Sequence, residues 1–163
     1  AKPRKRQARL AAIDPLQGVP APRAYPLERG WSAIVDGVGG TGVITIGAVP
    51  GMAAHLEGKG VGIIDMAGLA QKGGAVHSHL RIAATPAEVD CIHVAAGNAD
   101  FVFGGDLVVT GSSKVLTTVR HGHTRCLVNT AETMHGYFTR SADFRLPTEA
   151  MKQAISDAAG PEQ

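Results

Sequence analysis

Residues 37–42 read Gly-Val-Gly-Gly-Thr-Gly, a match to the pattern Gly-x-Gly-x-x-Gly. An apolar run at residues 32–36 precedes the motif and predicts a buried strand, and residues 41–57 predict a helix after it. Glycines let the chain turn tightly and let a phosphate approach the backbone, while the start of a helix offers unpaired N–H donors. Two interpretations stay open: a loop that cradles an anion, or a turn whose glycines serve only close packing of the helix on the strand.

The segments that follow this motif alternate between strand and helix patterns. A second strand at residues 60–66 completes a strand–helix–strand unit. Further strands are expected at residues 76–83, 91–95, 107–110 and 125–129, and further helices at residues 98–103, from Ser112 or Ser113 to residue 119, and at Thr148–Ala159. This order predicts an α/β fold, a Rossmann-like three-layer α/β/α sandwich on a largely parallel sheet.

Pro50 falls inside the first predicted helix and is followed by Gly51. Proline removes one helical hydrogen bond and clashes with the carbonyl four residues earlier, at a cost of about 3 kcal/mol in an unkinked helix. We therefore expect the helix either to bend at this point or to end and restart from Met52.

The first thirty residues differ in composition from the rest of the chain. They hold five of the nine prolines, and residues 1–9 carry five cations and no acid. We expect residues 1–30 to be a Pro-rich basic linker or tail, belonging to a chain cut from something longer, and residues 31–163 to form a single domain.

Charge, hydropathy and cysteine usage exclude several classes of function. The net charge is +2, but without the five terminal cations 11 Lys and Arg face 14 Asp and Glu, so no basic face for nucleic acid is expected. No apolar run approaches the roughly 20 residues that cross a bilayer, so no membrane partner is expected. Cys91 and Cys126 are the only cysteines and lie 35 positions apart, which predicts neither a disulfide framework nor a metal cluster and suits a reducing cytoplasm.

Other chemical signals along the chain are weaker. Asp65 lies 23 residues beyond Gly42, where a dinucleotide-binding fold places the acid that binds the ribose, although an acid here can also simply end the strand. Two His-x-His pairs, at residues 77–79 and 121–123, have no acid or cysteine at a recognised ligand spacing, so no metal is expected. Neither a nucleophile elbow nor a paired-carboxylate motif occurs, so we assign no catalytic residue to this chain.

A second glycine-rich loop at residues 67–74 reads Ala-Gly-Leu-Ala-Gln-Lys-Gly-Gly. It is expected to return to the carboxyl edge of the sheet, where α/β folds bind ligands. Within it, Lys72 could meet a phosphate and Gln71 a carbonyl or amide group, although either could equally be a surface residue.

These two loops, with the sequences that surround them, resemble the gamma domain of 2-oxoacid:ferredoxin oxidoreductases. The resemblance runs from about Trp31 to Pro147. The sequence is most similar to the indolepyruvate branch in the stretches 65–76, 78–83, 106–109 and 127–133. Lys72 stands where other branches carry an arginine, and Pro50 stands where the family more usually has an apolar helix former.

The resemblance implies that the chain is a component of an enzyme that oxidatively decarboxylates an arylpyruvate such as indolepyruvate. The products are an arylacyl-CoA, carbon dioxide and reduced ferredoxin, and thiamine diphosphate and 4Fe–4S clusters perform this chemistry. This chain has neither a cluster-binding cysteine run nor a thiamine fingerprint, so those groups are expected in other domains or subunits of a homodimeric parent enzyme. The isolated fragment is expected to be inactive.

This domain is expected to contact the cosubstrate coenzyme A and also to contribute to assembly of the parent enzyme. The candidate coenzyme-binding residues are Gly37, Gly39, Gly40, Thr41, Gly42, Gln71, Lys72, Gly73, Gly74 and Asn129. The alternative is a stand-alone NAD(P)-binding module of the Rossmann type, for which Asp65 is the discriminating residue.

Overall fold

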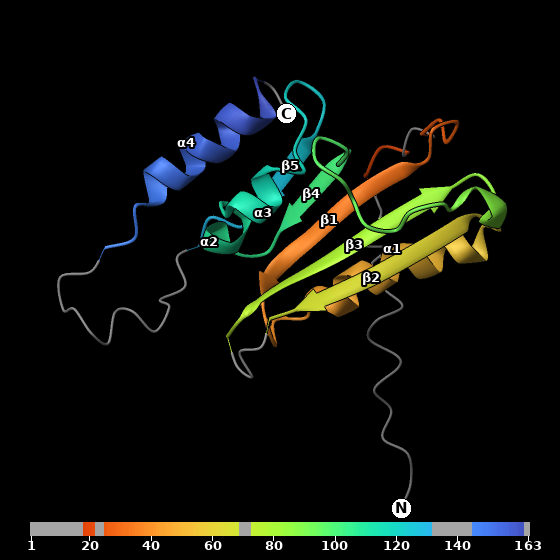
Figure 1. Ribbon diagram of the computed structural model, residues 1–163, viewed down its shortest axis with the longest axis horizontal. Coiled ribbons are helices and arrows are strands. Elements are labelled where there is room, and N and C mark those ends of the chain that lie inside the picture. Colours follow the sequence, from red (N-terminus) through yellow and green to blue (C-terminus); the bar gives the residue numbers. More distant parts are fainter. Residues whose placement is uncertain (1–17, 22–24, 69–72, 132–144, 162–163) are drawn as a thin grey trace, which may run out of the picture.

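The computed structural model describes residues 18–21, 25–68, 73–131 and 145–161. A five-stranded sheet of order β2-β3-β1-β4-β5 forms its centre (Figure 1). The strands are β1 (Trp31–Val38), β2 (Gly60–Ala67), β3 (Ala75–Ala83), β4 (Phe101–Gly104) and β5 (Arg125–Val128). The helices are α1 (Val43–Leu56), α2 (Leu107–Thr110), α3 (Ser113–Leu116) and α4 (Thr148–Ala159), with a 3-10 turn at Pro86–Glu88.

Most strands of the sheet run in one direction. β4 is parallel to β1 and to β5, whereas β3 is antiparallel to both β1 and β2. Since β1 and β2 both oppose β3, they point the same way, and four of the five strands are parallel in direction. The predicted α/β fold with a largely parallel sheet is therefore confirmed, with β3 inserted as a reversed strand between β1 and β2.

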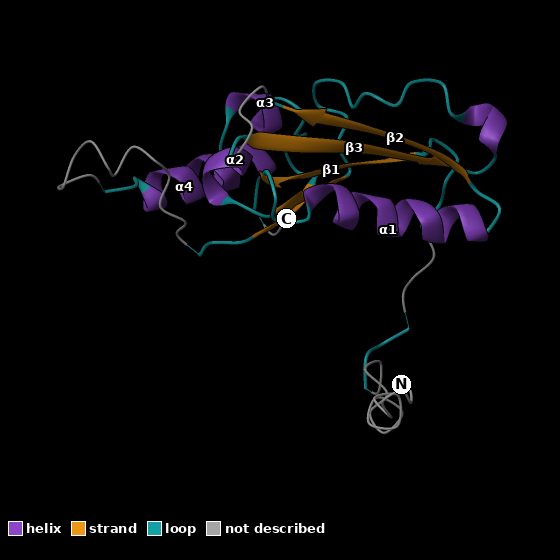
Figure 2. Cartoon of the chain, turned by 90° about the horizontal axis from the view of Figure 1, so that it is seen from below, coloured by secondary structure: helices purple, strands orange, loops and turns teal. Residues whose placement is uncertain are grey.

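The helices cover both faces of the sheet. Figure 2 shows α1 along one face and α3 on the opposite face. α4 packs against α2 at the end of the sheet that carries β4 and β5. Gly122, in the turn before β5, also contacts α4: its N donates to Ala159 O at 2.6 Å. These layers form the α/β/α sandwich.

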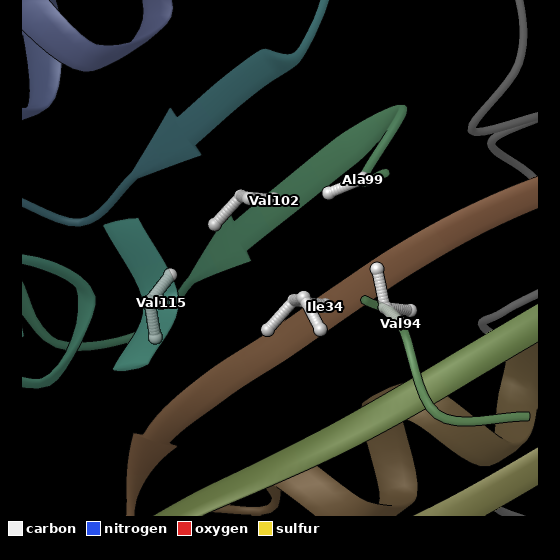
Figure 3. Packing of buried hydrophobic residues seen from close by; sticks show 5 residues of the cluster. All are labelled: Ile34, Val94, Ala99, Val102 and Val115. Atoms are coloured by element: carbon white, nitrogen blue, oxygen red, sulfur yellow. The ribbon is translucent and has the colours of Figure 1, made fainter. Parts of the chain in front are cut away.

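Alternating side chains of β1 build the two halves of the core. On the α3 face, Ile34, Val94, Ala99, Val102 and Val115 form one buried cluster, to which the loop residue Val94 and the helix residue Val115 are brought from opposite sides (Figure 3). Burying a valine or isoleucine side chain stabilises the fold by about 1.5–3 kcal/mol. This cluster fixes α3 and the loop that contains Val94 on the sheet.

On the other face, two glycines let α1 approach the sheet closely. A Cβ at Gly47 would lie 2.6 Å from Ser78 Oγ, and one at Gly51 would lie 2.5 Å from Ile63 Cδ1. The buried positions Val43, Gly47, Gly51 and Ala54 follow helical spacing, so one narrow face meets the strands. The helix continues through Pro50 without a break, so the alternative in which it ends and restarts at Met52 is wrong.

Three predicted segments have a different secondary structure. Residues 107–110 form α2 instead of a strand, because Asp106 Oδ1 accepts from Val108 N and Val109 N at 3.0 Å and so starts a helical turn. Residues 98–103 do not form a helix, since Phe101–Gly104 is paired on both sides as β4. Residues 91–95 are not a strand: Val94 N donates to His79 Nδ1 at 3.0 Å instead of joining a ladder.

The remaining elements follow their predicted positions closely. α3 ends at Leu116, before the predicted residue 119, and its N-cap Ser112 makes no side-chain cap hydrogen bond. α4 has the predicted bounds, and Pro147 occupies its N-cap position.

The boundary at residue 30 between linker and domain stays a prediction, because much of residues 1–30 lies outside the described part. Within that part, Tyr25 Oη donates to Asp100 Oδ1 at 3.3 Å, and Arg81 Nη2 donates to Arg29 O at 3.0 Å. The chain is therefore attached to the sheet from about Tyr25 onward. None of the described helices has the length and hydropathy that a membrane span requires.

Candidate functional site

The first glycine-rich loop joins β1 to α1 at the carboxyl end of β1. Gly40 and Gly42 have φ values of +92° and +93°, a conformation that glycine adopts without the steric cost of a Cβ. Thr41 Oγ1 donates to Val38 O at 2.7 Å, and Thr41 N points to the same carbonyl at 3.2 Å. The threonine hydroxyl therefore donates its proton within the turn, so it can act toward a ligand only as a hydrogen-bond acceptor.

The loop leaves the first turn of α1 with free donors. The first hydrogen bond inside the helix runs from Ile46 N to Gly42 O at 2.9 Å. The N–H groups of Val43, Ile44 and Thr45 have no acceptor among the described residues, and the N-cap Gly42 has no side chain to offer one. Free donors and the positive end of the helix dipole favour an anion here.

A crevice of about 500 Å³ opens beside this loop at the carboxyl ends of β1, β4 and β5. It is lined by Asp36, Val38, Thr41, Val43, Ile46, Phe103, Gly104, Gly105, Asp106, Leu127, Val128 and Asn129. Its location is the edge at which α/β sheets bind ligands. Of the predicted coenzyme-binding residues that the structure describes, Thr41 and Asn129 line this crevice, whereas the predicted glycines of the first loop do not.

Asn129 also holds the walls of this crevice in place. Its backbone N donates to Gly104 O at 2.7 Å, and its Nδ2 donates to Gly105 O at 3.2 Å. Its Oδ1 accepts from Ala131 N at 3.0 Å. One Nδ2 hydrogen is left for a ligand, so the side chain has a structural task besides the predicted one.

The second loop touches the first but opens elsewhere. Gly39 N donates to Gly74 O at 2.8 Å, so this N–H is not available to a ligand. Gly74 lines a different cavity, on the α3 face of the sheet, and neither it nor Gly73 lines the 500 Å³ crevice. Gln71 and Lys72 lie outside the described residues, and the contacts proposed for them stay predictions.

Asp36, near the end of β1, is a buried carboxyl group that the sequence analysis did not select. It is 0% exposed, and its Oδ2 has no hydrogen-bond partner. Burial raises the pKa of Asp36 to about 7, against the smaller lowering effect of the Thr110 hydrogen bond. The feature of the sequence that could have identified Asp36 is an acidic residue at the end of a largely apolar predicted strand.

The hydrogen bonds around Thr110 show how Asp36 is accommodated. Thr110 Oγ1 lies 2.7 Å from Asp36 Oδ1 and 2.8 Å from Asp106 O. The hydroxyl has one proton for these two acceptors, so both bonds form fully when Asp36 is protonated and donates to Thr110, which in turn donates to Asp106 O. The geometry therefore agrees with the raised pKa in favouring a neutral Asp36.

The sheet order bears on the dinucleotide alternative. Asp65 pairs with Ser78 of β3, and β3 separates β2 from β1. In a dinucleotide-binding fold the strand with the ribose-binding acid lies directly beside the strand that precedes the glycine loop. The inserted strand thus removes Asp65 from the position that NAD(P) binding requires.

The two His-x-His pairs have separate surroundings. His77 and His79 are buried on β3, whereas His123 Nε2 lies 2.7 Å from Asp100 Oδ1. Across the described ranges, no group of three His, Cys, Asp or Glu side chains is placed to hold a metal ion.

Comparison with known proteins identifies the family. A solved structure, the pyruvate oxidoreductase subunit PORC of Thermotoga maritima, is similar with 21% identity and a TM-score of 0.49 over 68% of this chain. The chain spans 55% of that subunit's length. No curated protein matches the sequence significantly. The family model described as pyruvate ferredoxin/flavodoxin oxidoreductase matches residues 32–156, which include β1 except Trp31 and all of β2 to β5, and the chain therefore belongs to this family.

Proposed function

We propose that this chain is the gamma-type domain of a 2-oxoacid:ferredoxin oxidoreductase and that it contributes the coenzyme side of the site. The observation that carries the proposal is the set of three unpaired N–H groups at Val43, Ile44 and Thr45, which begin α1 beside a 500 Å³ crevice. The sequence resemblance to the indolepyruvate branch supports an arylpyruvate as the substrate of the parent enzyme.

Coenzyme A fits the chemistry of this crevice. Its phosphate groups suit the free donors at the start of α1, as in other helix N-termini that bind phosphate. Phe103, Ile46 and the half-exposed Leu127 provide an apolar wall for its pantetheine arm. The conformation of the loop depends on four of the predicted residues: Gly37, Gly40, Thr41 and Gly42. Gly39 instead joins the first loop to the second through its hydrogen bond to Gly74.

The chain's own residues do not fit an iron–sulfur cluster. A cluster held by four thiolates needs four cysteines, and this sequence has only Cys91 and Cys126. A cluster held by two thiolates and two histidines needs these side chains close together, and within the described ranges no three His, Cys, Asp or Glu side chains are grouped to hold a metal ion. Cys126 lies half-buried in β5, where burial raises the pKa of its thiol to about 11 and so disfavours the thiolate that would bind iron. We therefore assign the clusters, and with them the thiamine chemistry and ferredoxin contact, to other subunits or domains.

The outer face of α1 supports a role in assembly with those subunits. Ile44, Val49, Met52 and Leu56 are 50–79% exposed, and α1 contains no Asp, Glu, Lys or Arg. An apolar groove of about 380 Å³ continues this surface between the helix and Phe101 and Phe103 of the sheet. A continuous apolar surface of this kind marks a protein–protein contact. We assign it to another subunit of the same oxidoreductase, in a homodimeric parent enzyme.

Calorimetric titration of the chain with coenzyme A, with NADH in parallel, tests the proposed function. Coenzyme A is expected to bind and NADH is not. Binding of NADH in preference would support the dinucleotide module instead, and binding of neither would refute a coenzyme site on this chain.

Two variants of one residue locate the site. Ile44→Pro removes one free N–H from the first turn, where proline is tolerated, and Ile44→Ala shortens the same exposed side chain but keeps the N–H. Loss of one hydrogen bond to a phosphate costs about 1.5–3 kcal/mol, or roughly ten- to a hundredfold in affinity. Only the proline variant should lose this affinity; equal affinities of the two variants would place the coenzyme elsewhere.

A further inference from the structure

A second cavity lies on the α3 face of the sheet, away from the coenzyme crevice. Its volume is about 690 Å³, within the range of small-molecule sites, and it shares no described lining residue with the crevice. Ile34, Val94 and Val115 give it a largely apolar wall. The wall is built from β1, the loop over the sheet and α3, the same elements that form the buried cluster of Figure 3.

Four nitrogen-bearing side chains line this cavity, which we call the histidine cavity. They come from three elements: His77 and His79 from β3, His93 from the loop that follows it, and Lys114 from α3. No acidic residue occurs among its described lining residues, and Lys114 has no ion-pair partner in the described part of the chain. The cavity therefore has positive charge and hydrogen-bond donors without a counter-charge.

His79 is held as a neutral donor. Its Nδ1 accepts from Val94 N at 3.0 Å, so the ring proton is on Nε2. Burial, together with the nearby His93 and His77, lowers the pKa of His79 to about 4, and its ring stacks on that of His93 at a centroid distance of 4.5 Å. The Nε2–H has no acceptor among the residues that the structure describes.

His77 lacks a partner at the same cavity. The residue is 8% exposed, and its buried Nδ1 makes no hydrogen bond. Burial, and to a smaller extent the charge of Lys114, which lines the same cavity, lower the pKa of His77. An unpaired buried polar atom costs about 1–3 kcal/mol, and a ligand acceptor or donor would recover that loss.

We propose that the histidine cavity binds a small molecule that carries one carboxylate on an apolar body. The apolar body packs on Ile34, Val94 and Val115, and the carboxylate accepts from Lys114 and from the imidazole groups of His77 and His79. This site is separate from the coenzyme crevice, and its assignment does not depend on the proposed function.

Titration of the full 163-residue chain with 3-phenylpropionate, followed by the imidazole resonances in ¹H–¹³C NMR spectra, tests the proposal. The resonances of His77 and His79 should shift and saturate, whereas those of His55 and His121, exposed on other elements, should not. The neutral analogue 3-phenylpropanol has the same body and should bind at least about tenfold more weakly, because charge-assisted hydrogen bonds are about twice as strong as neutral ones.

The absence of a saturable shift at about 10 mM 3-phenylpropionate would overturn the proposal, since even millimolar affinity would be visible at that concentration. Equal affinity for the acid and the alcohol would also overturn it, because the cavity would then select only the apolar body.

The variant Lys114→Met keeps the length of the side chain but removes its charge. It should weaken binding of 3-phenylpropionate by roughly tenfold and leave binding of the alcohol unchanged. Lys59→Met, at the turn before β2, is the matched control and should bind like the original chain. If Lys114→Met binds the acid as tightly as this control, the carboxylate is not held at the histidine cavity.

Discussion

At the scale of single residues, Asp36 makes the stability of the fold depend on pH. Its carboxyl is fully buried, and its pKa rises from 3.8 to about 7 on folding. A raised pKa means that the folded state binds the proton more tightly, so the stabilisation is complete below pH 3.8 and is lost as the pH rises to about 7. The pKa shift corresponds to about 4 kcal/mol at most.

The variant Asp36→Asn removes this titration but keeps an amide that can donate to Thr110 Oγ1. We predict that the variant gains stability relative to the original chain between pH 5 and pH 8, by about 1–3 kcal/mol. Urea unfolding at the two pH values measures the difference. Comparison with the original chain cancels the opposite contribution of His79, whose lowered pKa removes stability as the pH falls toward about 4. A stability difference between variant and original chain that does not change with pH would show that Asp36 does not titrate in this range.

The residues of the candidate site were only partly predictable. The Gly-x-Gly-x-x-Gly pattern indicates the tight turn in which Gly40 and Gly42 have positive φ values. Asn129 was predictable because it lies at the end of a predicted strand. That Gly39 donates to Gly74 depends on two loops 35 residues apart in sequence meeting in space, which no local pattern encodes. Asp36 was missed because only the position of α2 shows that its carboxyl is enclosed.

At the scale of elements, the close approach of α1 to β3 depends on Gly47. The Cβ of an alanine would lie 2.6 Å from Ser78 Oγ and 3.2 Å from Ser78 Cβ, so the helix or the strand must shift. We predict that Gly47→Ala destabilises the chain by about 1–3 kcal/mol, measured by urea unfolding.

The double variant Gly47→Ala, Ser78→Ala tests whether this contact is the cause. Removal of Ser78 Oγ relieves the shorter contact, and the hydroxyl has no partner to lose. Part of the lost stability should return, so that the two substitutions are non-additive. Strict additivity would mean that the destabilisation arises elsewhere in the helix.

The elements that the sequence predicted well are those whose local pattern and long-range packing agree. β1, α1 and β2 follow from apolar runs around the glycine loop. The secondary structures of segments 98–103 and 107–110 were predicted wrongly because both segments are short, and periodicity does not separate a short strand from a helical turn. Pairing with β1 and β5 decides the first segment, and the Asp106 cap decides the second. The insertion of β3 between β1 and β2 likewise depends on pairing between strands distant in sequence, which local patterns do not predict.

At the scale of the whole molecule, the exposed apolar surface of α1 predicts a contact with another subunit. Met52, one of the side chains of that surface, is 59% exposed. Met52→Glu should abolish co-purification with the other subunits of the oxidoreductase and change the free energy of unfolding by no more than about 0.5 kcal/mol. Ala150→Glu, an exposed position of α4, is the control that should retain the partners. Assembly that survives Met52→Glu would place the subunit contact on another face.

The central claim is that the start of α1 binds the phosphate groups of coenzyme A. The most direct test is a ¹H–¹⁵N spectrum of the chain during titration with coenzyme A. We predict saturable shifts of the backbone amides of Val43, Ile44 and Thr45, whose N–H groups have no acceptor in the described structure, and of Asn129 across the crevice. Saturable shifts confined to other elements, or none at any of these four amides, would contradict it.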